Sequence, residues 1–247
     1  MAPSFDRTFL IGLASRLRLA WRPARDDRAR LLPAKDLFAF AQELMARGDG
    51  DREDGSPWRR SVVFRDGLAI AILCIRPDRA KTFAAIRLGA NLVRAGDTFW
   101  LHFRRNETKN RRPLDMPLPL VFSGWIDRYL GHHRQLLMHR PPGRIDWPDG
   151  PLWVTHDGRA MRPGKLSEHL KGVTERELGK GINLHLYRKI IPTELAIHDP
   201  AHTGIAQPLL GHATYRMTEQ AYNLGRAIDA ARKVGATIGT LRKKEEE

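Results

Sequence analysis

The sequence predicts a mainly α protein with a small antiparallel β-sheet at one edge. Two stretches, residues 33–47 and 58–75, place apolar side chains at helical spacing or in a long apolar run. Between residues 91 and 118, short apolar runs alternate with turn residues, which is the pattern of strands joined by a hairpin. Hydrophobic residues make up 42% of the chain, which is a globular composition rather than a disordered one.

The first predicted element is a short helix over residues 5–19, and a strongly basic linker over residues 22–30 follows it. The next predicted helix, residues 33–47, begins at Pro33, which suits the first turn of a helix because its missing N–H is not needed there. A loop of glycine and acidic residues then leads to the long, largely buried helix predicted over residues 58–75.

Pro77 breaks that helix, and Asp78 is predicted to cap the next one, residues 79–88. Three strands are expected, at residues 91–93, 98–103 and 114–118. The last two form a β-hairpin with a charged tip, because turn-forming and basic residues separate them.

A further helix is expected over residues 120–138 and a short strand over residues 152–155. From about residue 163 to 242 the chain is expected to be mostly helical, with breaks at 179–183, 198–203 and 211–214. The stretch 226–241 has apolar residues at intervals of three and four. This stripe either packs on the protein's own core or docks on a neighbouring copy.

The charge of the chain points to a polyanionic partner. Lys and Arg total 42 against 28 Asp and Glu, so the formal net charge is +14. Nucleic acid is the first candidate and an anionic membrane surface the second, beside a merely solvated basic surface. A single cysteine, Cys74, argues against a disulfide and against a Cys/His zinc site. No apolar stretch is long enough for a membrane span, so we expect a soluble cytoplasmic protein without a cofactor.

Several separated residues indicate chemistry when they are taken together. Arg79 opens a predicted helix and Lys109 lies at the hairpin tip, where such side chains are usually just solvated. His185 and Arg188 are three positions apart, so they share one helix face, as ordinary surface pairs also do. Each signal alone has a plain structural explanation.

The last signal is a Leu-Leu-Gly-His sequence that ends at His212, with Tyr222 ten residues later. In this order, the signals resemble the tyrosine recombinase (phage integrase) family over roughly residues 33–226. The resemblance includes the motifs Met-Pro-Leu at 116–118, His-Leu-Tyr-Arg at 185–188 and Pro-Leu-Leu-Gly-His at 208–212. Tyr215 follows the histidine too closely to fit the family pattern.

The resemblance implies the catalytic fold of that family and cleavage of DNA through a 3′-phosphotyrosine, without metal or nucleotide. Tyr222 is then the nucleophile, and Arg79 and Arg188 grip phosphate oxygens, where charge develops in the transition state. Lys109 is implied as the general acid for the departing 5′ oxygen.

The resemblance further implies that His185 assists proton removal from Tyr222 and that His212 hydrogen-bonds the phosphate. Two positions depart from the family pattern. Thr82 stands where an acidic residue often supports the first arginine, and Lys189 stands where a histidine often follows the second.

The resemblance divides the chain into three parts. Residues 1–32 are a short helix and basic linker, a candidate remnant of the family's core-binding domain. Residues 33–226 are the catalytic domain, and residues 227–247 are a C-terminal helix and charged tail that the family pattern assigns to self-association as a tetramer on DNA.

The function expected is a site-specific recombinase or integrase of a mobile element, acting on double-stranded DNA. The alternatives are a truncated, recombination-incompetent remnant that still binds DNA, a type IB topoisomerase-like enzyme, and a basic DNA- or RNA-binding protein without catalysis. Basic residues near the hairpin and near a helix start are candidates for phosphate contacts. They are Arg104, Arg105, Arg111, Arg112, Lys165 and Lys171.

Overall fold

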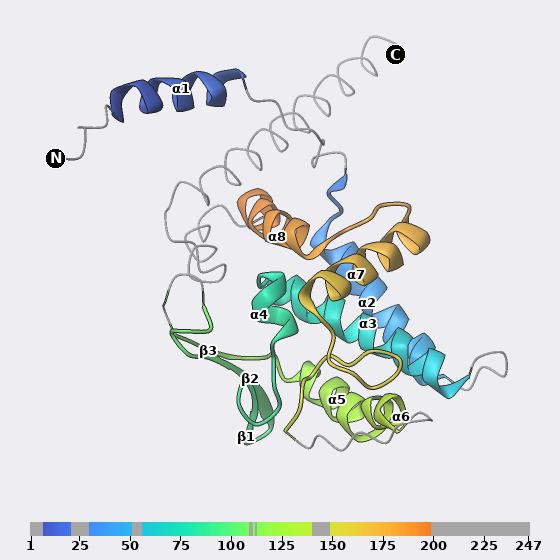
Figure 1. The fold of residues 1–247 in the computed structure, drawn as a ribbon. Helices are drawn as coiled ribbons and strands as arrows, with labels where there is room; N and C mark the ends of the chain where they lie inside the picture. The colour runs from blue at the N-terminus through green and yellow to red at the C-terminus, as the bar shows by residue number, and fades with distance from the viewer. Residues whose placement is uncertain are drawn as a thin grey trace, which may run out of the picture. The chain divides into compact units, whose positions relative to one another are not determined.

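The structure is a computed structural model, and the predicted fold class is confirmed by its mainly helical architecture with a three-stranded antiparallel sheet (Figure 1). It describes residues 7–20, 30–50, 56–108, 111, 113–139 and 149–198. The chain divides into two compact units, Met1–Arg30 and Leu31–Glu247.

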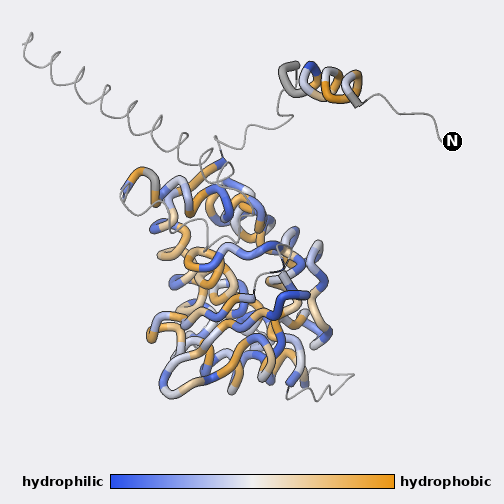
Figure 2. Tube along the Cα trace, turned by 90° about the vertical axis from the view of Figure 1, so that its left-hand side faces the viewer, coloured by the Kyte–Doolittle hydropathy of each residue, from blue (hydrophilic) through white to orange (hydrophobic). Residues whose placement is uncertain are grey.

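The first unit contains the helix α1 (Arg7–Ala20), which confirms the helix predicted over residues 5–19. Its apolar side chains are exposed: Phe9, Ile11 and Leu17 each keep more than 60% of their surface accessible. Figure 2 shows these hydrophobic stretches along α1 in orange. These apolar side chains of α1 are therefore exposed rather than buried.

In the second unit, α2 (Ala34–Asp49) and α3 (Pro57–Ile75) pack against each other as a pair and confirm two predicted helices. Their backbones approach closely at two glycines. A Cβ atom added at Gly67 would lie 2.6 Å from the carbonyl oxygen of Ala41, and one at Gly48 would lie equally close to a backbone nitrogen of α3. These positions exclude any side chain larger than hydrogen without movement of a helix.

Every residue of α3 from 64 to 74 is buried, so this helix is the core of the unit. Cys74 is 8% exposed and has a free thiol, which confirms that it is buried. Burial raises the pKa of this thiol to about 12, because the thiolate would lose its hydration. The cysteine therefore behaves as a small apolar side chain.

Helix α4 (Ala80–Ala84) is shorter than the predicted span 79–88. After one tight turn at Ala85, the backbone groups of Ile86 and Leu88 bond to a distant segment instead of continuing the helix. The Leu152 N–H donates to the carbonyl of Ile86 at 2.8 Å. The predicted length was wrong because a distant segment supplies partners that local helix propensity does not reveal.

The predicted cap of α4 was also wrong. Arg79, not Asp78, occupies the N-cap position, and no side chain caps this helix. The Asp78 carboxylate instead forms an ion pair with Arg76, with Oδ1 at 3.2 Å from Nη2. An ion pair to a buried guanidinium outcompetes capping of a five-residue helix.

The sheet confirms the three predicted strands with shifted ends. The strands are β1 (Leu92–Ala95), β2 (Thr98–Phe103) and β3 (Leu114–Pro117). They pair in the order β1-β2-β3, and both pairings are antiparallel. Leu101 lies opposite Leu92 and Met116 in this register. Alternate residues of β2 are buried, so one face of the sheet covers the core.

The helix predicted over residues 120–138 is a helical run with a π-helical turn inside it. It consists of α5 (Val121–Arg128), the π-turn η2 (Tyr129–His133) and α6 (Arg134–Met138). The hydroxyl of the buried Tyr129 donates to the carbonyl of Leu152 at 3.0 Å. Such turns are rare, and periodicity of apolar residues does not predict them.

The predicted strand at residues 152–155 is not part of the sheet. This segment makes only isolated bridges within the described residues, Arg87 with Pro151 and Val154 with Ala160. Its apolar side chains are buried, and the Trp153 indole N–H donates to the carbonyl of Phe83 at 2.9 Å. The strand prediction was wrong because the apolar run reflects burial in the core rather than sheet pairing.

Two helices, α7 (Pro163–Leu178) and α8 (Leu184–His198), follow, and the predicted break at residues 179–183 separates them. Gly179 adopts a left-handed conformation with φ of 68°, which suits glycine at a helix end. The predicted breaks at 198–203 and 211–214 and the helix at 226–241 extend beyond, or lie outside, the described residues.

Helix α3 contacts α2, η2, α6, α7 and α8, and Figure 1 shows it inside the second unit. Helix α4 contacts α7, and β2 contacts α5. The helices therefore surround α3, and the sheet closes one side beside α5. None of the helices that the structure describes is both long enough and apolar enough to span a lipid bilayer.

Candidate active site

The segment between α3 and α4 carries the first predicted arginine. The Arg76 N–H donates to the carbonyl of Ile72 at 2.7 Å and ends α3, and the Asp78 N–H donates back to the Arg76 carbonyl at 2.9 Å. Pro77 lies between them and cannot continue a helix. This tight turn leaves Arg79 half-buried at the start of α4.

Helix α8 carries the second predicted arginine. The Asn183 side chain accepts a hydrogen bond from the Leu186 N–H at 3.1 Å, which begins the helix. One turn later, Arg188 donates from Nη1 to the carbonyl of Pro77 at 2.7 Å, and it is only 8% exposed. The fold thus joins two segments that are 111 positions apart in the sequence.

Arg79 lies close enough to Arg188 for its positive charge to affect the pKa of Arg188. Burial and the positive charge of Arg79 together lower the pKa of Arg188 to about 10, and Asp78 opposes this shift. Arg188 remains protonated at neutral pH. Burial also raises the pKa of Asp78, and the three neighbouring arginines oppose this shift. The result is a concentrated positive charge on a rigid turn.

His185 is exposed in the first turn of α8, one turn before Arg188. Both side chains therefore start from the same side of one helix. An exposed imidazole at this place is accessible to a ligand that reaches the arginines.

Three of the predicted catalytic residues, Lys109, His212 and Tyr222, lie outside the described residues. The structure brings Arg79 and Arg188 together and places His185 on the same helix as Arg188. The convergence of all six residues stays a prediction.

The candidate DNA contacts differ in their surroundings. Arg104, Arg105 and Arg111 are exposed in the connection between β2 and β3, and Lys165 is exposed in the first turn of α7. Lys171 is half-buried, lies against Gly181 and is 4.0 Å from a carboxylate oxygen of Glu175. Lys171 is therefore less available to a phosphate than the others. Arg112 lies outside the described residues.

The sequence interpretation missed the role of Asp78 beside the arginines and treated it as a helix cap. Asp78 and Arg76 are both buried, at 6% and 4% exposure. The signal that was available is the Arg-Pro-Asp-Arg sequence at 76–79 directly after an apolar helix. Three of these four residues are charged, and at the end of a buried helix they form a dense group of charges in a poorly solvated place.

A second buried charged group lies in the core. Arg65 donates to Asp66 Oδ1 from Nη2 at 2.7 Å and to the carbonyl of Val154 from Nη1 at 2.7 Å. The other Asp66 oxygen lies 2.7 Å from Nε2 of His169. Although burial favours the neutral acid, Arg65 and His169 hold the pKa of Asp66 below its usual value. This group joins α3 to α7 and to the segment before α7.

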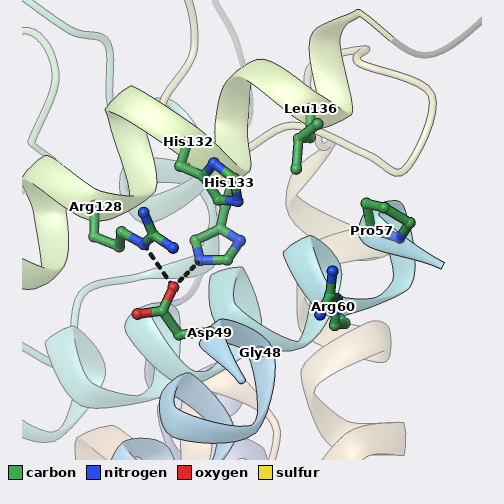
Figure 3. A pocket seen from close by; sticks show the side chains of 8 residues that line it. All are labelled: Gly48, Asp49, Pro57, Arg60, Arg128, His132, His133 and Leu136. Carbon is green, nitrogen blue, oxygen red and sulfur yellow. Dashed lines mark hydrogen bonds and ion pairs between the residues drawn. The ribbon is translucent and has the colours of Figure 1, made fainter. Parts of the chain in front are cut away.

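Figure 3 shows a small pocket beside the π-turn. Its volume is about 160 Å³. Asp49 lies between Arg128 and His133 and hydrogen-bonds Arg128 Nε at 2.5 Å. His133 is buried and stacks on Phe64, and burial together with His132 lowers its pKa to about 4. This imidazole is therefore neutral at physiological pH.

Comparisons with known proteins place these features in context. No protein-family model matches the sequence. A segment of 72 residues is 32% identical to the tyrosine recombinase XerC of Pseudomonas fluorescens, and the match covers 29% of this chain and 24% of XerC. The chain therefore matches about a quarter of that relative's length.

The fold is similar to that in the crystal structure of XerA recombinase, with a TM-score of 0.53 and 13% sequence identity. The match covers 87% of this chain and 66% of the XerA chain. At this identity the likeness shows a shared fold, namely the catalytic fold of tyrosine recombinases. Both comparisons thus find similarity to tyrosine recombinases, one over a short stretch of sequence and the other in the fold.

Proposed function

We propose that this chain is a tyrosine-type site-specific recombinase that cleaves and rejoins double-stranded DNA through a 3′-phosphotyrosine at Tyr222. The observation that carries the proposal is the pairing of Arg188 with the turn that holds Arg79. A fold gains little stability from placing the buried Arg188 guanidinium near that of the half-buried Arg79, because like charges repel. The negative charge of a bound phosphate offsets the repulsion between the two guanidinium groups.

Two guanidinium groups can bind a phosphodiester while its phosphoryl group is transferred. Each offers planar, permanently charged donors that match two phosphate oxygens. In the five-coordinate transition state the non-bridging oxygens gain charge, and fixed donors stabilise that state more than the ground state. The hydrogen bond from Arg188 to Pro77 holds one donor group in place before DNA arrives.

The remaining steps are assigned to residues by the family pattern. The Tyr222 oxygen attacks phosphorus, the bond to the 5′ oxygen breaks, and Lys109 supplies the proton to that leaving oxygen. His185 assists removal of the phenol proton, whose pKa is near 10 in water, and His212 donates to the phosphate. Rejoining reverses these transfers, so the covalent phosphotyrosine conserves the bond energy and neither ATP nor a metal is required.

The proposed division of the chain follows the same pattern. Residues 33–226 form the catalytic domain, residues 1–32 contribute a helix and a basic linker, and residues 227–247 mediate assembly as a tetramer on DNA. The net charge of +14 and the exposed Arg104, Arg105 and Arg111 supply phosphate contacts that set register rather than sequence choice. We further propose that the enzyme acts in the cytoplasm and comes from a mobile element.

The test is covalent trapping on DNA. The full chain is mixed with a library of nicked duplexes that carry random central sequences. The nick makes the fragment with the released 5′ hydroxyl short, so that it diffuses away after cleavage. Adducts that survive a denaturing gel are recovered and sequenced. We expect an adduct with the wild type and with Tyr215→Phe, and none with Tyr222→Phe.

Each alternative predicts a different result. An adduct that persists in Tyr222→Phe would reject the assignment of the nucleophile. DNA binding without any adduct would indicate a DNA-binding protein that lacks strand transfer. An adduct accompanied by relaxation of supercoiled plasmid, without joining of two sites, would favour a topoisomerase-like enzyme.

A further inference from the structure

This chain lacks the acidic residue that often supports the first arginine in the family pattern. The family pattern often has an acidic residue three positions after the first arginine, and this chain has Thr82 there. Thr82 is half-buried in α4 and carries no charge. Yet the turn before α4 contains a carboxylate of its own, that of Asp78.

Asp78 is surrounded by arginines. Its Oδ1 is 3.2 Å from Nη2 of Arg76, and the positive charges of Arg188 and Arg79 also act on its carboxylate. The side chains of Asp78 and Arg76 are 8% and 5% exposed. With the carboxylate ionised, the four groups carry a net charge of +2, because three guanidinium charges meet one carboxylate. Without it the net charge would be +3 in a place that water screens poorly.

The peptide geometry links this carboxylate to both arginines of the proposed site. Asp78 follows Pro77, whose carbonyl accepts the Arg188 hydrogen bond at 2.7 Å, and it precedes Arg79 at the N-cap of α4. The Asp78 N–H donates to the Arg76 carbonyl at 2.9 Å, so the turn is closed on itself. The Asp78 backbone therefore connects the carbonyl that anchors Arg188 directly to Arg79 at the start of α4.

We infer that Asp78 is a positioning residue that holds Arg79 and Arg188 together against their mutual repulsion and so prepares both for one phosphate. The inference rests on the proposed function, and it assigns to Asp78 the task that an acidic residue at position 82 performs in the family pattern. Asp78 acts through the arginines and does not touch the phosphate.

A second feature of Asp78 fits this role. Within the described ranges its Oδ2 is buried and has no hydrogen-bond partner. A buried carboxylate oxygen without a partner is costly. It leaves an acceptor for a guanidinium N–H that turns toward it when the arginines close on DNA, since catalytic hydrogen bonds often tighten only in the complex.

The experiment compares Asp78→Asn with Asp66→Asn in the full chain. Both changes keep the side-chain shape, remove a buried carboxylate and break an ion pair with an arginine. Both should lower the melting temperature. In single-turnover trapping on a duplex recovered from the library, Asp78→Asn should lower the rate at saturating DNA by about 10- to 100-fold, as expected when reacting groups are misplaced.

The other readouts separate positioning from folding. The DNA concentration for half-maximal rate should change by less than about threefold in Asp78→Asn, since the loss concerns the transition state rather than binding. Asp66→Asn should keep the wild-type rate, and Asp78→Glu should recover at least part of the rate that Asp78→Asn loses. Equal rates for wild type and Asp78→Asn, or equal losses in Asp78→Asn and Asp66→Asn, would overturn the inference.

A measurement without DNA keeps this test distinct from that of the proposed function. In protein labelled with ¹⁵N-arginine, the Nε–Hε signal of Arg188 is assigned by its loss in Arg188→Lys. We expect Asp78→Asn to shift this signal and to speed its exchange with water by about tenfold or more, and Asp66→Asn to leave it in place. If wild type forms no adduct, the proposed enzyme fails while this signal still decides whether Asp78 holds the arginine. An unchanged Arg188 signal in Asp78→Asn would reject the positioning role.

Discussion

Gly67→Ala should destabilise the protein because α2 and α3 leave no room for a methyl group at their crossing. The added Cβ would lie 2.6 Å from the carbonyl oxygen of Ala41 and 2.9 Å from two atoms of Met45. Ordinary contacts begin at 3.4 Å, so the helix backbones must separate by about 3.4 − 2.6 = 0.8 Å. Overpacking of this kind costs about 1–3 kcal/mol, and the obstacle here is backbone rather than a flexible side chain.

The matched control is Gly172→Ala. Gly172 lies within α7, and a Cβ there would meet nothing within 4 Å. Alanine is a better helix former than glycine, so this change should stabilise the protein by about 0.5–1 kcal/mol. The two substitutions have the same chemistry and opposite expected signs.

Urea unfolding followed by far-ultraviolet circular dichroism gives both free energies, and thermal scans give the melting temperatures. For a unit of this size each kcal/mol shifts the melting temperature by about 2–4 °C. Gly67→Ala should therefore melt about 2–12 °C below wild type, and Gly172→Ala slightly above it. A Gly67→Ala protein as stable as wild type would refute the close approach of α2 and α3.

Three further predictions concern the charged groups. Arg188→Lys should lower the rate of adduct formation at saturating DNA by roughly 100-fold or more, because an ammonium group cannot hold the turn and form paired bonds to a phosphate; a normal rate would show that the guanidinium is not required. Between pH 7 and pH 4, wild type should lose up to about 3 kcal/mol more stability than His133→Phe, because the folded-state pKa of about 4 lies below the unfolded value of about 6.5 and the unfolded chain binds the extra proton. Parallel urea-derived stabilities of the two proteins across this range would contradict it. Arg104→Ala and Arg105→Ala should each reduce the salt slope of DNA binding, measured by fluorescence anisotropy, by about 0.9. Arg47→Ala, which removes an ion pair with a carboxylate at 3.0 Å, should leave the slope unchanged.

The helices that could be predicted are those whose own residues decide them. In residues 33–47 the apolar spacing indicates one buried face, and α2 indeed buries Leu37, Phe40 and Leu44. In β2 successive side chains point to opposite faces of the sheet, so burial alternates although Phe99, Trp100 and Leu101 are all apolar. Periodicity works here because each element buries one face against a single neighbouring layer.

The elements that were mispredicted depend on distant partners. Helix α4 ends at Ala84 because the next backbone groups bond to residues 150–152, and the apolar run at 152–155 fills the core without joining the sheet. The π-turn at 129–133 interrupts a run that is helical by periodicity. The bonds beyond α4 have partners tens of residues away, so no local pattern contains them.

The sequence by itself determined the fold class, the basic charge and the order of residues that resembles a tyrosine recombinase, because these properties are written in composition and spacing. Only the tertiary structure decided that Arg188 reaches the turn before Arg79 and that Asp78 is an ion-pair partner rather than a cap. It also decided that the side chains of Arg188 and Asp78 are buried. The physical reason is that charge interactions depend on distance and solvation, and both are set by packing between segments 111 positions apart.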